Sequence, residues 1–194
     1  MSKSNRISIF DYPLIYNVTQ FLLEGNFYSK LKTPLKKYLT GTVLDICCGT
    51  GDLYRIVSGK YVGLDLNKKS LIYAKKKYPK AKFVHMDATK TNFKASSFDT
   101  VFLIDCIHHF NKRTLNKVLS EAKRVSKKYV IIIDMIPVKN PISKLIYSLD
   151  QGANIITLKQ QVEILSKKFT IVEKKSFFSP RRLYKHSLII CSIK

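Results

Sequence analysis

The 194-residue chain is poor in acidic residues, with 13 Asp and Glu against 35 Lys and Arg, which gives a formal net charge of +22. It lacks an uncharged apolar run of about 18 residues, so we expect no membrane-spanning helix. Asp11 and Pro13 interrupt the opening sequence, so we expect no signal peptide. Internal repeats and low-complexity linkers are also missing, and the length suits a single domain.

Cysteine pairs of the CxxC type are absent, so the sequence does not predict a zinc site. The four cysteines are Cys47, Cys48, Cys106 and Cys191, and each lies in or beside an apolar run. Such positions are typical of buried, reduced thiols. We therefore expect a reducing, cytoplasmic location and no bound metal.

The positive charge has two interpretations that stay open. It indicates either an anionic partner, such as nucleic acid or a membrane surface, or a general bias toward lysine. Only six of the 35 basic residues are arginine, whose planar group suits specific phosphate sites, and the lysines are scattered along the chain. We expect at most weak attraction to anionic lipid or nucleic acid, with peripheral membrane association left open and no dedicated protein partner.

The stretch VLDICCGTGDL, residues 43–53, is the most informative part of the chain. An apolar run ends near Asp45, a turn of small residues follows, and a second apolar run resumes at Leu53 with helical spacing. Strand, tight turn and helix in this order are typical of nucleotide-type binding sites. Glycine in the turn lets the backbone approach a ligand closely.

Three further apolar runs end in acidic residues, at Asp65, Asp87 and Asp105. Asp65 follows Asp45 by 20 residues, which is the spacing at which an acidic residue binds the two ribose hydroxyls of a nucleotide. A carboxylate can accept both hydrogen bonds of a vicinal diol. The carboxyl ends of four successive strands are therefore predicted to form one continuous ligand crevice.

The motifs VLDICCGTGDL, VGLDLN, FVHMDAT and FDTVFLIDCIHHF resemble those of class I S-adenosylmethionine-dependent methyltransferases. The similarity is greatest to the small-molecule branch that contains ubiquinone and menaquinone biosynthesis enzymes. It implies a Rossmann-like α/β fold: a doubly wound, seven-stranded sheet, mostly parallel with one antiparallel strand. Residues 1–40 would form a helical cap on a core of residues 41–194.

The resemblance implies that S-adenosylmethionine is the cofactor. In this family Asp45 would order the first loop and bind the methionine amino group, Asp65 would bind the ribose, and Asp87 would bind adenine or else cap the next turn. Cys47 occupies a position that is usually glycine, and we expect a negative φ there. The remaining predicted cofactor residues are Gly49, Thr50, Gly51, Leu66, Met86, Ala88, Ile104 and Asp105.

The segment after the fourth strand, Asp105 to Phe110, would face the methyl acceptor. Methyl transfer to a hydroxyl or an enol-type carbon needs a proton acceptor, and a histidine can provide one near neutral pH. His109 is the first candidate for the base and His108 the second; structural packing is the alternative for both. The segment lacks the Asn/Asp-Pro-Pro-aromatic pattern of amino-methylating enzymes, which favours an oxygen or carbon acceptor.

The flanking segments are predicted to shape the acceptor pocket. In the cap, apolar periodicity predicts one helix before Gly25 and a second one with Thr33 as N-cap and Pro34 at its first position. Tyr16, Arg181 and Tyr184 are candidate substrate residues, although packing of the cap and a solvated hairpin explain them equally. The core is predicted to continue with helices 52–58, 112–124 and 158–168 and strands 129–134, 169–178 and 186–193.

The sequence thus predicts methyl transfer to the oxygen or carbon of a small, quinone-like or lipid-like acceptor. Two alternatives stay open. The net charge of +22 is compatible with an RNA-modifying methyltransferase, and the binding motifs alone are compatible with a non-catalytic cofactor-binding protein.

Overall fold

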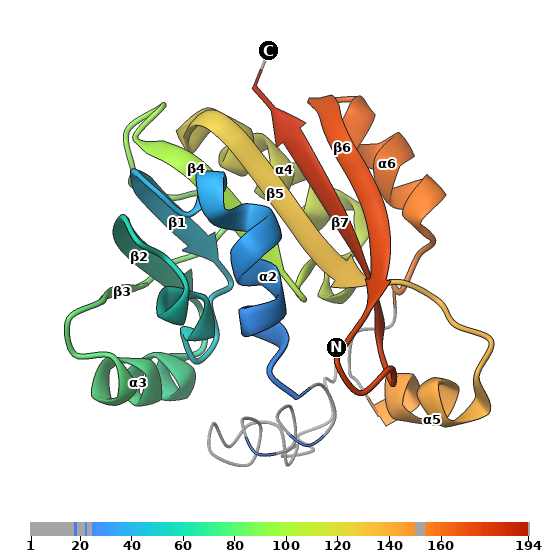
Figure 1. Cartoon of the computed structure of the whole chain (residues 1–194). Helices are drawn as coiled ribbons and strands as arrows, with labels where there is room; N and C mark the ends of the chain where they lie inside the picture. The colour runs from blue at the N-terminus through green and yellow to red at the C-terminus, as the bar shows by residue number, and fades with distance from the viewer. Residues whose placement is uncertain (1–17, 19–21, 23–24, 150–153, 194) are drawn as a thin grey trace, which may run out of the picture.

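The computed structural model of the chain describes residues 18, 22, 25–149 and 154–193. Seven strands form one twisted sheet in the order β3-β2-β1-β4-β5-β7-β6 (Figure 1). Strand β7 runs antiparallel to both of its neighbours, whereas the strands from β3 to β5 are parallel. The predicted fold is confirmed. The strands are β1 (Thr42–Ile46), β2 (Lys60–Asp65), β3 (Lys82–His85), β4 (Phe98–Ile104), β5 (Ser126–Met135), β6 (Thr170–Phe178) and β7 (Lys185–Ser192).

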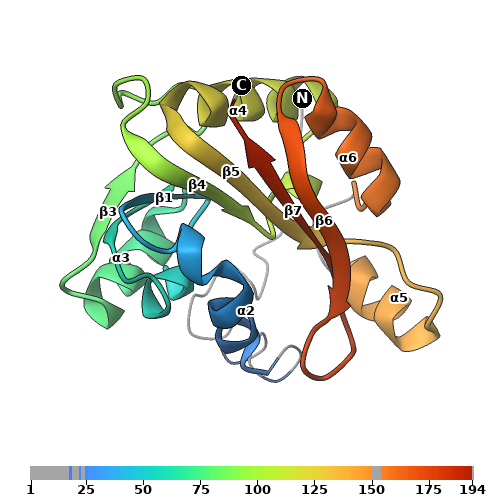
Figure 2. The same cartoon turned by 45° about the horizontal axis from the view of Figure 1, so that its top comes forward.

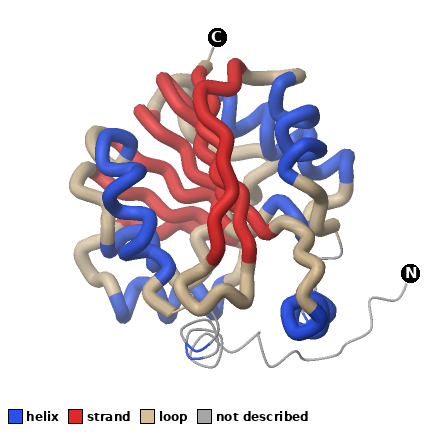
Figure 3. The backbone as a smooth tube through the Cα atoms, turned by 45° about the vertical axis from the view of Figure 1, so that its right-hand side comes forward, coloured by secondary structure: helices blue, strands red, loops and turns tan. Residues whose placement is uncertain are grey.

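Helices cover both faces of the sheet, as Figure 2 and the side view in Figure 3 show. Helices α4 and α6 pack on one face, and α2 and α3 pack on the other. The described helices are α2 (Phe27–Leu35), α3 (Lys68–Lys77), α4 (Lys112–Val125), α5 (Pro141–Leu149) and α6 (Leu158–Ser166), with short 3-10 turns η2 (Lys36–Tyr38), η3 (Asp52–Arg55) and η4 (Ile107–His109).

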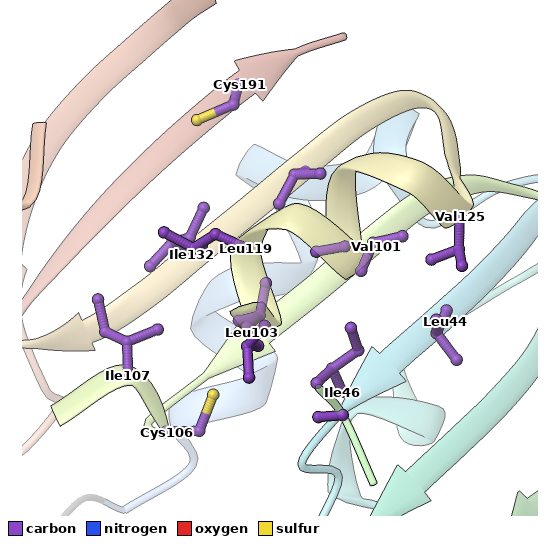
Figure 4. Close-up of a cluster of buried hydrophobic side chains, with 14 of the residues drawn as sticks. Leu44, Ile46, Val101, Leu103, Cys106, Ile107, Leu119, Val125, Ile132 and Cys191 are labelled. Atoms are coloured by element: carbon purple, nitrogen blue, oxygen red, sulfur yellow. The ribbon is translucent and has the colours of Figure 1, made fainter. Parts of the chain in front are cut away.

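The central strands are buried on both faces because their side chains alternate between two apolar clusters. In β4, Val101 and Leu103 join the cluster under α4, while Phe102 and Ile104 join the cluster under α2. Figure 4 shows the first cluster, in which β-strand side chains pack against Leu119 and Val125 of α4. This two-sided burial explains why these strands read as nearly continuous apolar runs.

Five predicted elements, β5, β6, β7, α4 and α6, are found within three residues of their expected bounds. The Asn67 side chain accepts hydrogen bonds from the N–H groups of Lys69 and Ser70, as an N-cap does. These elements position the first, second and fourth strand ends as the sequence predicted.

Two helix predictions are wrong. Thr33 and Pro34 lie inside α2, which already begins at Phe27; Pro34 has no N–H to donate to the carbonyl four residues before it, and α2 ends one residue later, at Leu35. The expected helix 52–58 is only the single turn η3. It stops there because the N–H groups of Ser58 and Gly59 both bond to the carbonyl of Leu39, at 2.9 and 3.1 Å. The predicted helix before Gly25 falls mostly outside the described residues.

The turn after β1 has a left-handed backbone at Cys47, with φ of 60°, so the expected negative φ is wrong. The chain must reverse here while the N–H of Cys48 donates to the carbonyl of Leu64 at the end of β2, at 3.0 Å. Gly49 and Gly51 are also left-handed, with φ of 51° and 77°. A side chain in this conformation costs about 1–2 kcal/mol relative to the right-handed region.

Asp45 lies buried on the α2 face of β1, where it accepts a hydrogen bond from the Tyr61 hydroxyl at 2.8 Å. Burial raises the pKa of Asp45 from 3.8 to about 7, although the hydrogen bond from Tyr61 opposes this rise. The negative charges of Asp65 and Asp52 add to it. The protonated form of this carboxyl is therefore favoured by the native structure.

We expect Cys47→Gly to stabilise the native state by about 0.5–1 kcal/mol, because relief of the left-handed strain exceeds the added entropy of the unfolded chain. Urea unfolding measures the change. Cys48→Gly is the matched control, because Cys48 is buried and outside the left-handed region, and we expect it to be destabilising. Equal destabilisation by both substitutions would contradict the claim that the left-handed backbone at Cys47 is strained.

Asp45→Asn should change the pH dependence of stability. Because the native pKa exceeds the unfolded one, the stability due to the bound proton is complete below about pH 4 and is lost as the pH rises toward 7. Wild-type protein should therefore lose up to about 4 kcal/mol relative to Asp45→Asn over this range. Urea titrations at a series of pH values measure it, and a pH-independent difference would refute a raised native pKa.

Candidate functional site

The predicted site residues converge because parallel strands end at the same edge of the sheet. The turn after β1, Asp65 at the end of β2, the segment after β3 and the segment after β4 all lie at the carboxyl edge. The register of the strands produces this arrangement: Ile46, the last residue of β1, pairs with Leu64 near the end of β2 and with Leu103 near the end of β4. Ligands of open α/β sheets bind at this edge, where the strand order reverses next to β1.

Asp65 joins the first turn to the second strand. One carboxylate oxygen accepts the N–H of Gly49 and the other accepts the N–H of Asn67, both at 2.8 Å. A carboxylate oxygen has two lone pairs, so each oxygen keeps acceptor capacity for a ligand. A Cβ added at Gly49 would meet no atom within 4 Å, so the backbone there is open to a ligand.

A cavity of about 690 Å³ lies beside this turn. This volume is within the range of small-molecule sites. Six predicted cofactor residues line it: Cys47, Asp65, Leu66, Met86, Asp87 and Ala88. Asp87 also accepts the N–H of Thr89 at 2.7 Å, so it caps the next turn while it lines the cavity.

The opposite wall of the cavity was not predicted from the sequence. This wall comes from the first two turns of α4 and from the residue that follows η4, namely Phe110, Arg113, Thr114, Lys117 and Val118. The signal that could have found them is topological: a helix that follows a parallel strand begins at the strand's carboxyl end, so its first turns border the crevice. Phe110 and Val118 give this wall an apolar surface.

Other predicted cofactor residues do not line the cavity. Asp45 faces Tyr61, and the Thr50 hydroxyl donates to Asp52 at 2.7 Å. A Cβ at Gly51 would lie 2.5 Å from the Phe83 ring, so this glycine is required by packing. Ile104 is buried in the apolar cluster under α2. These residues hold the turn in place, and their direct contact with a cofactor stays a prediction.

Asp105 ends β4 with a left-handed backbone, φ of 47°. One of its carboxylate oxygens lies 3.3 Å from Nε2 of His186 on β7, and that imidazole has no exposed surface. The ring of His186 packs against Phe27 of the cap, with ring centres 4.7 Å apart. Asp105 therefore connects the end of β4 to the cap and to β7.

The two candidate bases have different surroundings. His108 is buried and its Nδ1 pairs with the carboxylate of Asp134 on β5. Asp134 also accepts the N–H groups of Ile107 and His108, at 2.7 and 3.2 Å, so it holds the whole η4 turn. His109 is exposed, with its ring centre 4.1 Å from that of His108. The sequence did not separate these environments.

The predicted substrate residues are not gathered at this cavity. Tyr184 is buried, and its ring stacks on Tyr147 of α5 at 5.5 Å between centres. Arg181 is exposed in the turn between β6 and β7. Tyr16 lies outside the described residues. A substrate role for these three residues stays a prediction.

The buried thiols are not poised for nucleophilic chemistry. A side-chain hydrogen bond with Cys47, together with burial, raises the pKa of Cys106 well above its usual value. Burial raises the pKa of Cys48 as well. Both thiols stay protonated at neutral pH, which supports the interpretation of Cys106 as a packing residue.

In the described part of the chain, no group of three or more His, Cys, Asp or Glu side chains is placed to hold a metal ion. Within the same residues, every helix is too short or too polar to cross a membrane.

The chemistry of the site fits S-adenosylmethionine. Asp65 offers acceptor capacity for ribose hydroxyls, the turn at Gly49 is open, and the cavity combines the apolar surfaces of Met86, Phe110 and Val118. An adenosyl group needs both kinds of surface, because its ribose is polar and its purine has a flat apolar face.

Comparison with known proteins agrees with this geometry. Residues 43–129 match the family described as "Methyltransferase domain". A demethylmenaquinone methyltransferase of Thermotoga maritima is 26% identical over 148 residues, which are 70% of this chain and 64% of that protein. The chain thus spans less than two thirds of this relative's length.

Solved structures share the fold. The PH0226 protein of Pyrococcus horikoshii superposes with a TM-score of 0.72 at 20% identity, with both chains covered in full. A magnesium protoporphyrin IX methyltransferase of Synechocystis with bound S-adenosylhomocysteine has a TM-score of 0.67 at 19% identity, covering 86% of this chain and 81% of that one. Residues 43–129 thus match a methyltransferase domain, and the chain shares its fold with solved structures that include this methyltransferase with bound S-adenosylhomocysteine.

Proposed function

We propose that this protein transfers the methyl group of S-adenosylmethionine to the oxygen or carbon of a small, partly apolar acceptor. The observation that carries the proposal is the cavity at the carboxyl edge, in which Asp65 faces the open backbone turn at Gly49. The demethylmenaquinone methyltransferase relative supports a quinone-like or lipid-like acceptor. We further propose that residues 1–194 act as one catalytic domain, with residues 1–40 as its cap.

In this proposal Asp65 binds the two ribose hydroxyls with the acceptor capacity that Gly49 and Asn67 leave free. Asp87 accepts from the adenine amino group, while Met86 and Ala88 contact the ring from one side and Phe110 and Val118 from the other. The predicted binding of the methionine amino group by Asp45 would be indirect, because the carboxyl of Asp45 is buried against Tyr61.

S-adenosylmethionine supplies a methyl group that is already activated by its sulfonium. The protein's tasks are therefore to align the acceptor, exclude water and accept a proton. We assign proton acceptance to His109, which is exposed on η4 at the end of β4. His108 is a positioning residue in this scheme, because its bond to Asp134 fixes the turn that carries His109.

Asp65→Ala should weaken S-adenosylmethionine binding by at least about tenfold, equivalent to about 1.4 kcal/mol, because two charge-assisted hydrogen bonds to the ribose are lost. Isothermal titration calorimetry with S-adenosylmethionine or S-adenosylhomocysteine measures it. Asp99→Ala is the matched control, since Asp99 accepts from Thr42 at the start of β1, at the opposite edge of the sheet. A change of less than about twofold in Asp65→Ala would contradict the ribose assignment.

His109→Ala should lower the turnover of methyl transfer by about 10²–10⁴ while cofactor affinity and thermal stability stay unchanged. The assay incubates the protein with labelled S-adenosylmethionine and with lipids, small metabolites and RNA as separate pools, followed by kinetics on the fraction that becomes labelled. His108→Ala is the contrast: it should lower stability, because it leaves Asp134 buried without its imidazole partner. Wild-type turnover in His109→Ala would rule out this base.

The same pools separate the alternatives. Label in the lipid or metabolite pool supports the proposal. Label only in RNA would favour an RNA-modifying enzyme, and cofactor binding without label in any pool would favour a non-catalytic binding protein.

A further inference from the structure

Helix α5 has one face that packs on the protein and one that is solvent-exposed. On the inner side Ser143 is buried, and the Tyr147 hydroxyl donates to the carbonyl of Ile136 at 3.2 Å and accepts the N–H of Lys185 at 3.1 Å. On the outer side Ile142 and Leu145 are 60% and 66% exposed. Side chains three positions apart are neighbours on a helix, so these two form one apolar surface.

Basic residues lie in the same segment as this apolar surface and in the hairpin to which α5 is joined. Lys139 and Lys144 are exposed at the start of α5 and within it. Tyr147 fastens the helix to the β6–β7 turn, where Arg182 and Lys185 lie over the Phe178 ring, 4.9 and 5.5 Å from its centre. Residues 136–149 and 177–193 contain no Asp or Glu. We call Ile142 and Leu145, together with Lys139 and Lys144 of the same segment, the α5 surface.

The α5 surface lies at the edge of the sheet where the ligand crevice opens. Figures 1 and 2 both place α5 next to the end of β5 and the β6–β7 hairpin, on the side toward which the parallel strands point. The surface itself exists independently of the acceptor's identity.

We propose that the α5 surface docks the protein reversibly on an anionic lipid bilayer. Exposed aliphatic side chains next to lysine and arginine are the composition of helices that lie in a membrane interface, where the apolar groups enter the acyl boundary and the cations contact headgroups. The net charge of +22 attracts the protein to an anionic bilayer at long range. The two aliphatic side chains favour contact of this face, among all faces of the protein, with the bilayer. Nucleic acid would use the cations but offers no apolar layer for Ile142 and Leu145.

The test is co-sedimentation with vesicles of phosphatidylcholine, with and without phosphatidylglycerol. We expect binding to the phosphatidylglycerol vesicles that weakens with added salt. The double substitution Ile142→Ser and Leu145→Ser should lower the partition coefficient by about tenfold or more, because two aliphatic side chains no longer leave water. Lys139→Glu with Lys144→Glu should weaken binding to the anionic vesicles.

Ile72→Ser is the matched control. Ile72 on α3 is 61% exposed and lies near the exposed Lys75 and Lys76, so it offers the same chemistry on a different face. It should leave vesicle binding unchanged. All variants change exposed side chains, and unchanged thermal unfolding together with unchanged S-adenosylmethionine binding would separate loss of docking from loss of fold or of the cofactor site.

Four results would overturn the proposal. The first three are no binding of wild-type protein to anionic vesicles, an equal loss of binding with Ile72→Ser, and full binding by the double serine variant. The fourth is that the protein binds polyuridylate more tightly than vesicles and that the double serine variant keeps its polyuridylate binding. The third result would mean that diffuse charge alone attracts the protein to lipid. The fourth would indicate that nucleic acid, and not a bilayer, is the preferred anionic partner.

Discussion

The carboxylate of Asp65 is the link on which the site depends. It holds the N–H of Gly49 and the N–H of Asn67 at the same time, and so connects the turn after β1 with the start of α3. Parallel pairing fixes the register of β1 and β2, but it does not fix the backbone conformation of the turn that follows β1. The carboxylate of Asp65 restricts the conformation of this turn. The left-handed backbone at Cys47 is maintained because the surrounding hydrogen bonds hold the turn in place.

The aspartates near the strand ends have different structural roles because the residues around them differ. Asp65 is partly exposed and faces a cavity, whereas Asp45 is enclosed and pairs with Tyr61. Asp134 is fully enclosed and takes several N–H groups together with the His108 imidazole. The same side chain thus serves as a ligand contact, a buried packing group and a loop anchor, according to how many donors the fold brings to it.

Local patterns in the sequence were sufficient to predict the fold, and half of the residues predicted to bind the cofactor line the cavity. Apolar runs that end in Asp predicted the strands and their common edge. The sign of φ at Cys47 could not be predicted from the sequence, because it depends on the hydrogen bond from the N–H of Cys48 to the carbonyl of Leu64 on another strand. The difference between His108 and His109 depends on Asp134, 26 residues further along the chain. Contacts between distant segments decide such features, and no local pattern encodes them.

Strand β6 forms one edge of the sheet, and its sequence has a consequence for solubility. Glu173, Lys174 and Lys175 are exposed on it, and its pairing with β7 is irregular between Ile171 and Glu173. An open edge offers free backbone groups to the edge of a second molecule, and charged side chains with an interrupted pairing pattern oppose such growth. At the far side β3 has only four residues, which is too short to template a long pairing. Both borders of the sheet therefore protect a cation-rich protein against self-association into fibrillar aggregates.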